Sequence, residues 1–266
     1  MKFTTIKYFI LAVILSFSTI QASESKNILD STLELGEQMS NMRKMLETYS
    51  LIATEVTYKS PDKRLKMSIA EYEDVINTMD KNFKDEYIKN SVKASRKAWK
   101  PVKTALLTAL EDNDAERLQK EGLFIHANIR SVIIELANMK KYLLKKAKVS
   151  NSQKLNASIE IAASARRLSA HYMMKMWGLP DPTIEEHWNN GVNIYTNSIA
   201  ELKKSDYYKD PEFKKRLDLC EKHLKYFNTI WMFDDKFMPA IVQEKADIAY
   251  RNANDMSRII LTDILK

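Results

Sequence analysis

The stretch LGEQMSNMRKMLETYSLIA, residues 35–53, decides the fold because its apolar residues recur at helical spacing. Apolar residues separated alternately by four and three positions form one continuous stripe along a helix, as in helical bundles and coiled coils. The stretch therefore predicts a long first helix over about residues 26–57, whose stripe packs against other helices. The stripe consists of Leu35, Met39, Met42, Leu46, Tyr49, Ala53 and Val56.

This pattern occurs twice in the chain. Residues 35–79 are similar to residues 157–202, which begin ASIEIAASARRLSAHYMMKM, with an offset of about 122. In each copy adjacent basic residues lie beside the stripe, and a break that contains proline (SPDK or GLPDPT) precedes a second helix. The repeat predicts two units, residues 23–149 and residues 150–266.

Each unit is predicted to be an antiparallel four-helix bundle, because four amphipathic segments joined by short polar turns follow one another. Glycine and proline are scarce, at 4 and 6 of 266 residues, and the apolar spacing is helical throughout. No glycine or proline linker separates the units around residues 146–153. The sequence thus predicts an all-α protein of two tandem units, elongated because the first unit's last helix runs almost continuously into the second unit.

The first 22 residues have the pattern of a secretory signal peptide. Lys2 and Lys7 are followed by an apolar run over residues 8–17, and Ala22 precedes the polar SESK. The run is shorter than the roughly 20 apolar residues that span a membrane. We therefore predict a signal peptide over residues 1–22, cleavage after Ala22 and a periplasmic protein. An uncleaved N-terminal anchor is the alternative.

Composition and motifs exclude several function classes. The formal net charge is +7, but basic and acidic residues alternate along the helices, so nucleic acid is not an expected partner. The single cysteine, Cys220, fits a buried apolar residue better than a nucleophile. The histidines His126, His187 and His223 stand apart without zinc or haem spacing, and no catalytic motif is present. Neither an enzyme nor a cofactor is predicted.

The centre of each first helix resembles a family motif. Residues 40–49 read SNMRKMLETY, and residues 162–171 read AASARRLSAH. Both resemble the pattern Ala-Gly-x-Gln-Arg-Met-Leu-Ser-Gln-Arg in the N-terminal sensor domain of type IV pilus methyl-accepting chemotaxis transducers, a domain related to the periplasmic domain of nitrate/nitrite sensor kinases. The basic residue before the Met-Leu pair is kept as Lys44 and Arg166. The family glycine and glutamine are missing from both copies.

The resemblance implies that basic side chains of the motif bind a small anion, such as nitrate or nitrite, where the first helices meet. A guanidinium presents a planar fork that matches a planar oxyanion. Solvation, or an ion pair between Arg43 and Glu47, is the alternative interpretation. The candidate anion-binding residues are Arg43, Lys44, Arg166 and Arg167, with Tyr49 and His171 as second-rank pocket residues in place of the second family arginine.

The methionines Met39, Met42 and Met45 form a separate constellation. Thioethers in an exported protein could bind Cu(I), which is a soft ion. Methionine also fills irregular gaps in helical cores because its side chain is flexible. A copper site and core packing are therefore alternative interpretations, and no other metal site is expected.

These features predict an exported, non-enzymatic sensory or ligand-binding protein. Members of the family that it resembles carry a transmembrane helix and a signalling module, and this sequence shows neither. The expected partners are therefore a small anion and a separate membrane receptor, transporter or kinase that receives the signal. A helical scaffold that binds a protein partner without a small ligand is the alternative, and a homodimer stays open.

Overall fold

The protein folds into eight α-helices and one short 3-10 helix in the part of the chain that the structure describes. A computed structural model describes residues 3–111, 114–233 and 237–266, with side chains from residue 25 onward. The predicted all-α fold is confirmed. The elements are α1 (Phe3–Ala53), α2 (Pro61–Asn82), α3 (Glu86–Thr108), α4 (Ala115–Ala147), α5 (Ser152–Trp177), α6 (Ile184–Lys203), η1 (Asp206–Lys209), α7 (Pro211–Trp231) and α8 (Pro239–Ile264).

Local sequence explains where several helices begin. Proline suits a first helical position, because its φ is already helical and the N–H it lacks would have no partner within the helix. The Asp114 side chain caps α4 by accepting a 2.7 Å hydrogen bond from the backbone N–H of Arg117. The helices α2, α7 and α8 begin at Pro61, Pro211 and Pro239.

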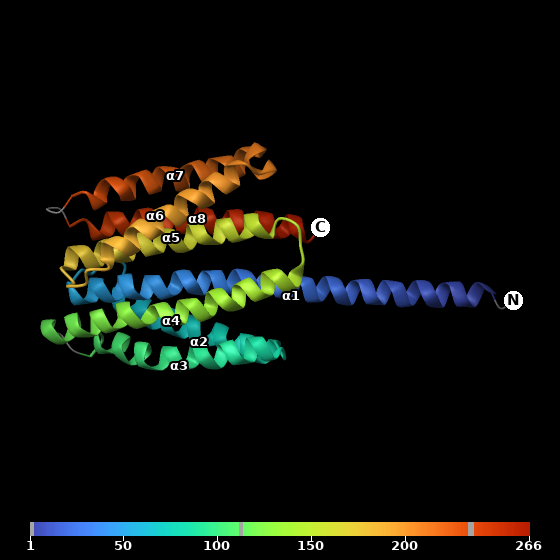
Figure 1. Ribbon diagram of the computed structural model, residues 1–266, viewed down its shortest axis with the longest axis horizontal. Helices are drawn as coiled ribbons and strands as arrows, with labels where there is room; N and C mark the ends of the chain where they lie inside the picture. Colours follow the sequence, from blue (N-terminus) through green and yellow to red (C-terminus); the bar gives the residue numbers. More distant parts are fainter. Residues whose placement is uncertain (1–2, 112–113, 234–236) are drawn as a thin grey trace.

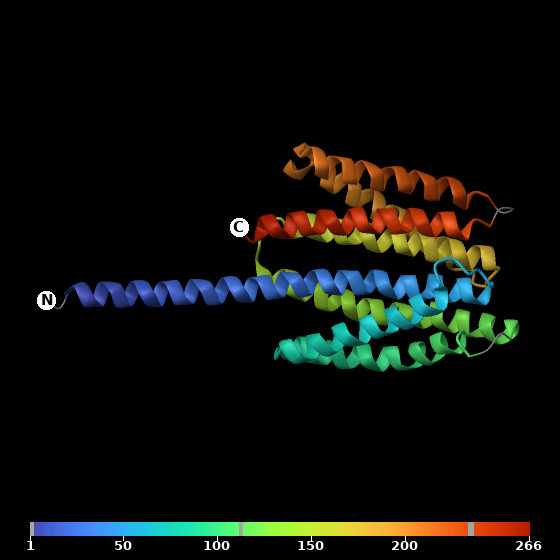
Figure 2. The ribbon, with the colours of Figure 1, turned by 180° about the vertical axis from the view of Figure 1, so that it is seen from behind.

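The helices form two halves that lie side by side, α1–α4 and α5–α8 (Figures 1 and 2). In the first half α1 and α3 each pack against α2 and α4, and in the second half α5 and α7 each pack against α6 and α8. The two first helices, α1 and α5, run in the same direction and pack against each other between the halves. Each half has its own hydrophobic core.

The prediction of an elongated rod is wrong. Helix α4 ends at Ala147, Lys148 and Asn151 adopt left-handed conformations with φ of 50° and 63°, and α5 returns alongside α1. The physical reason is that α1 and α5 each carry a second buried face. Leu29 of α1 belongs to the core of the second half, and Met174 of α5 belongs to the core of the first. End-to-end stacking would leave these faces in water.

The N-terminal part of α1 extends beyond the other helices (Figure 1). The predicted signal peptide, residues 1–22, lies outside the residues whose side chains are described, so its cleavage stays a prediction. Among the described residues, no helix combines the length and the apolar character needed to cross a membrane.

Candidate functional site

Two cavities flank the contact between α1 and α5, one on each side. The first, here called the cationic cavity, lies between α1, α4, α5 and α6, and the second, the mixed-charge cavity, lies between α1, α2, α5 and α8. Each has a volume of about 380 Å³. Basic residues of the predicted motif line both cavities, but different ones on each side.

Three arginines from three helices line the cationic cavity: Arg43 of α1, Arg130 of α4 and Arg167 of α5. Arg43 is only 6% exposed, and its Nη1 donates hydrogen bonds to the backbone carbonyls of Ala163 (3.2 Å) and Met39 (3.4 Å). Burial and the nearby Arg167 lower the pKa of Arg43 to about 9. Adding a negative charge here would relieve this electrostatic cost.

These three guanidiniums lack a carboxylate partner. Among the described residues, none of them forms an ion pair within 4.0 Å. The carboxylate of Glu160 attracts Arg43 and Arg167 from a greater distance, but it forms its own 2.6 Å ion pair with Lys140. The cavity therefore keeps an excess of positive charge.

Three histidines converge on the same cavity, although they are far apart in the sequence. The ring centroids of His126, His171 and His187 lie 5.5 to 5.8 Å from one another. The Nδ1–H of His171 donates to the backbone carbonyl of Arg167 at 2.7 Å, which leaves its Nε2 as the second ring nitrogen available for a ligand. Burial, together with His126, lowers the pKa of both His171 and His187.

One carboxylate lines the cationic cavity, and it is already engaged. Asp181 lies 2.6 Å from Nδ1 of His126 and accepts hydrogen bonds from the backbone N–H and hydroxyl of Thr183 at 2.8 and 2.7 Å. Burial opposes ionisation of Asp181, but these hydrogen bonds outweigh it and lower the pKa of Asp181 to about 2. The carboxylate therefore orients His126, and it offsets only one of the three arginine charges that line the cavity.

The lowered pKa of His171 makes stability depend on pH. We expect the free energy of unfolding to fall as the pH drops from 7 to 5, and we expect His171→Gln to reduce this slope. The pKa of His171 is held well below 6.5, so the unfolded chain binds a proton that the folded chain does not. This contribution is present above the unfolded pKa and is lost below it, at up to about 1.4 kcal/mol per pH unit. Urea titrations at several pH values measure it.

His223 of α7 also contributes to the pH dependence of stability. Burial also lowers its pKa, so part of the slope remains in the His171→Gln variant. The variant and the wild type are compared at the same pH, which cancels the contribution of the acidic residues. An identical slope in both proteins would show that His171 is not held neutral in the folded state.

The mixed-charge cavity contains the other two motif residues, Lys44 and Arg166, together with Glu37, Glu71 and Asp74. Lys44 is partly exposed, and burial and the nearby Arg166 lower its pKa. Unlike the arginines of the cationic cavity, Arg166 is bound by carboxylates of the protein itself.

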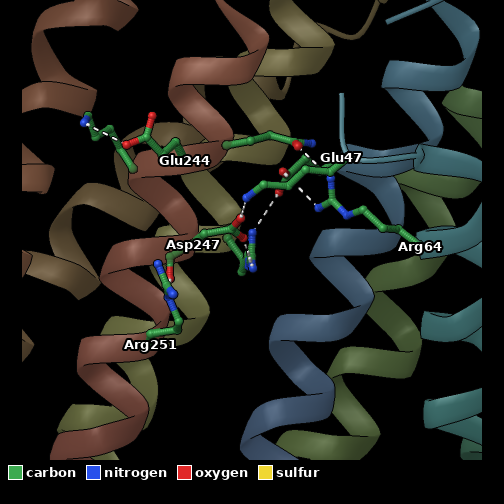
Figure 3. Close-up of polar contacts among 9 residues, drawn as sticks. Glu47, Arg64, Glu244, Asp247 and Arg251 are labelled. Atoms are coloured by element: carbon green, nitrogen blue, oxygen red, sulfur yellow. Dashed lines mark hydrogen bonds and ion pairs between the residues drawn. The ribbon is translucent and has the colours of Figure 1, made fainter. Parts of the chain in front are cut away.

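Arg166 joins the two halves through an ion-pair network. Its Nη2 donates to Asp247 of α8 at 2.5 Å, and its Nη1 lies 3.7 Å from the carboxylate of Glu47. Glu47 also lies 4.0 Å from Arg64 of α2, and Asp247 forms a 2.7 Å ion pair with Lys59. Figure 3 shows Glu47 between Arg64 and the α8 residue Asp247. Arg43 takes no part in this network, so the alternative pairing of Arg43 with Glu47 is wrong.

The repeat explains why the two sides differ. The apolar positions of α4 match those of α8 at an offset of 117, which aligns Arg130 with Asp247 and His126 with Gln243. A carboxylate thus occupies on one side the position that an arginine occupies on the other. Carboxylates of the protein neutralise the mixed-charge cavity, whereas the cationic cavity is not neutralised in this way.

The predicted site residues therefore separate into three places. Arg43, Arg167 and His171 line the cationic cavity, while Lys44 and Arg166 line the mixed-charge cavity, so the four basic residues do not form one site. Tyr49 lies in the core of the first half, where its hydroxyl donates to the carbonyl of Leu118 at 3.1 Å. Sequence reasoning missed Arg130, His126 and His187. Each aligns with a polar residue of the other half: Asp247, Gln243 and, at an offset of 123 beyond the proline-containing break, Arg64.

Packing accounts for the three methionines of the predicted constellation and for the single cysteine. Met39, Met42 and Met45 are at most 3% exposed and belong to the core of the first half. Cys220 is buried, and burial raises its pKa to about 12. Within the described residues, no group of three histidine, cysteine, aspartate or glutamate side chains is placed to hold a metal ion.

The chain was also compared with known proteins. No protein-family model, no curated protein and no solved structure matches it.

Proposed function

We propose that this chain is a small-anion-binding protein of the sensory or ligand-binding kind, and that the cationic cavity is its binding site. One observation supports this above all others. Three arginines line a cavity of about 380 Å³ at the contact between the two halves, and none of them has a carboxylate partner within the described parts of the chain. A cationic site of this kind, which is buried at Arg43, gains stability when an anion binds, because the anion replaces lost hydration.

The site is partly preorganised for an anion. The backbone carbonyls of Ala163 and Met39 hold Arg43, and the carbonyl of Arg167 fixes the orientation of His171. A guanidinium held in place loses little freedom when it binds a carboxylate or another oxyanion. The resemblance to nitrate/nitrite sensor domains makes these two anions the first ligands to test.

The proposed signal is a change in how α1 and α5 pack. The cavity is lined by Arg43 from α1 and Arg167 from α5, so an anion between them favours helix arrangements that bring the two arginines together. A partner that contacts either helix would detect this shift. We propose export to the periplasm and a membrane receptor or kinase as that partner, on the basis of the N-terminal sequence pattern and the resemblance.

The proposal is tested by calorimetric titration of the full chain with nitrate and nitrite. Heat of binding is expected with the wild type, and replacing Arg167 with glutamine should weaken binding about tenfold or more, since a charge-assisted hydrogen bond contributes roughly 1.5–3 kcal/mol. Arg43→Gln should act in the same direction. Arg96→Gln is the control, because Arg96 lies in α3 and pairs with Asp80 at the surface.

Two results would contradict the proposal. Binding that is unchanged in both Arg43→Gln and Arg167→Gln would place the anion elsewhere. No binding of nitrate, nitrite, acetate, sulfate or a dicarboxylate by the folded wild type would favour the scaffold without a small ligand.

A further inference from the structure

The cations of the cationic cavity are spread from its buried end to its mouth. Arg43 is buried, Arg167 is half-buried, and Arg130 is exposed. Burial and the charge of Arg130 lower the pKa of Arg167, and burial and the charge of Arg167 lower the pKa of Arg43. Arg167 is therefore the middle one of the three charges. A compact anion held at one end would leave the charge at the other end without a partner.

The charge of the lining residues suits two negative groups. Three arginines and one carboxylate, Asp181, line the cavity, which leaves a formal charge of +2 when the imidazoles are neutral. His126 and Thr183 already occupy Asp181. A monoanion would neutralise half of the excess, whereas a dianion would neutralise all of it.

The size and walls of the cavity indicate an organic ligand. Its 380 Å³ is the volume of about a dozen waters at roughly 30 Å³ each, and it falls within the range of small-molecule sites. An anion of four heavy atoms fills only a small part of this space. Apolar side chains lie among the cations, and an aliphatic segment could pack against them: Leu46, Ile129, Ile133 and Ala170.

We propose that the ligand of the cationic cavity is a small organic dicarboxylate, with one carboxylate at the buried Arg43 and Arg167 and the other at Arg130 near the mouth. This inference rests on the proposed function, since it names the class of anion for the same site. The aliphatic segment between the carboxylates packs against the apolar wall. Asn190, which is exposed at the mouth, adds an amide beside the outer carboxylate.

The histidines give the site capacity for a proton. The groups that face His171 and His187 are Arg43 from α1, His126 and Arg130 from α4, Arg167 from α5, and Asp181 and Glu186 at the start of α6. Burial, followed by the cationic groups among these, lowers the pKa of both imidazoles and so favours their neutral forms in the unliganded protein. A bound dicarboxylate cancels this positive field and favours protonation of the imidazoles, so its affinity should be higher at pH 6 than at pH 8.

Calorimetric titration of the full chain with succinate, acetate, nitrate and sulfate at pH 7 tests this inference. Succinate should bind at least about tenfold more tightly than acetate or nitrate, a difference of about 1.4 kcal/mol. The decisive variant is Arg130→Gln, which changes an exposed side chain and should leave folding intact. It should lower the affinity for succinate about tenfold and leave the affinity for acetate nearly unchanged, because acetate binds at Arg43 and Arg167.

The outcomes separate this inference from the proposed function. Nitrate or acetate binding as tightly as succinate would overturn the dicarboxylate and leave the anion site standing. Sulfate binding as tightly as succinate would show that a compact dianion is sufficient, which also overturns the inference. Equal losses of succinate and acetate affinity in Arg130→Gln would reject the two-ended arrangement. The absence of binding by all four anions would reject both proposals, and Arg96→Gln should match the wild type throughout.

Discussion

Replacing Arg166 with methionine is expected to lower the free energy of unfolding by about 3–5 kcal/mol, the typical effect of removing one partner from a buried ion pair. The Arg166 side chain is 5% exposed and the Glu47 side chain 0% exposed. Neither oxygen of Glu47 has a hydrogen-bond partner among the described residues. Without Arg166, the ion-pair partner left to Glu47 among the described residues is Arg64 at 4.0 Å, while Asp247 keeps Lys59. Urea unfolding followed by circular dichroism measures the loss.

The stability lost in the Arg166→Met variant should become smaller as the pH falls from 7 to 5. Burial already raises the pKa of Glu47, despite the attraction of Arg166 and Arg64, and removing Arg166 raises this pKa further. A carboxyl whose folded pKa is raised favours folding at low pH, where it is protonated, and this contribution disappears as the pH rises through the folded pKa. The Arg166→Met variant should therefore recover relative to the wild type in mild acid.

A surface arginine provides the matched control. Arg258 of α8 has a side chain that is 65% exposed and lies 3.3 Å from Glu37. Exposed pairs of this kind contribute about 0–1 kcal/mol, so Arg258→Met should change stability by no more than that. A similar small effect in Arg166→Met would show that the network does not hold the two halves together.

The fold could be predicted in class but not in arrangement. The period of the apolar residues and the positions of the prolines identify the helices, because both determine local structure within a few residues along the chain. The side-by-side packing depends on which faces of α1 and α5 are covered, and a single apolar stripe does not reveal this. The clue is in α5, where Ser158, Ala162 and Ala163 are buried along with the apolar stripe. Small residues on several faces indicate a helix that is surrounded by others.

The site could be predicted only in part, for a reason that lies in helix geometry. Consecutive residues on a helix point about 100° apart, since the helix has 3.6 residues per turn. Arg43 and Lys44 therefore face opposite sides of the contact with α5, as do Arg166 and Arg167. The sequence correctly points to basic residues at the centre of each first helix. The repeat matches them by sequence position, but it does not show which way each side chain points.

The two halves have diverged in how they neutralise this contact. Glu47 has no acidic counterpart in the second half, where Ser169 occupies the matching position. Asp247 has no acidic counterpart in the first half, where Arg130 occupies the matching position. Both carboxylates therefore act on the side of Arg166. The opposite side keeps the arginines and lacks matching acids. The charges that line the cationic cavity therefore sum to an excess of positive charge, whereas three carboxylates line the mixed-charge cavity.

The contact between α1 and α5 depends on Gly36, and replacing this residue with valine should lower the free energy of unfolding by about 1–3 kcal/mol. A Cβ at Gly36 would lie 2.4 Å from Cγ2 of Ile159, so α5 would have to move away from α1. Ile159 is β-branched and 1% exposed, so its side chain has little freedom to move aside. The same displacement would separate Arg43 from Arg167, and affinity for anions should fall with stability.

A double-mutant cycle with Ile159→Ala isolates this steric contact. Ile159→Ala alone removes buried atoms and should destabilise the protein by about 2–5 kcal/mol. The valine at position 36 would then fill the space that Ile159 leaves, so the double variant should be more stable than the sum of the two single effects predicts, by about 1 kcal/mol or more. Additive effects would mean that the two helices are not in contact at this position, and the contact between the halves would have to be placed elsewhere along α1.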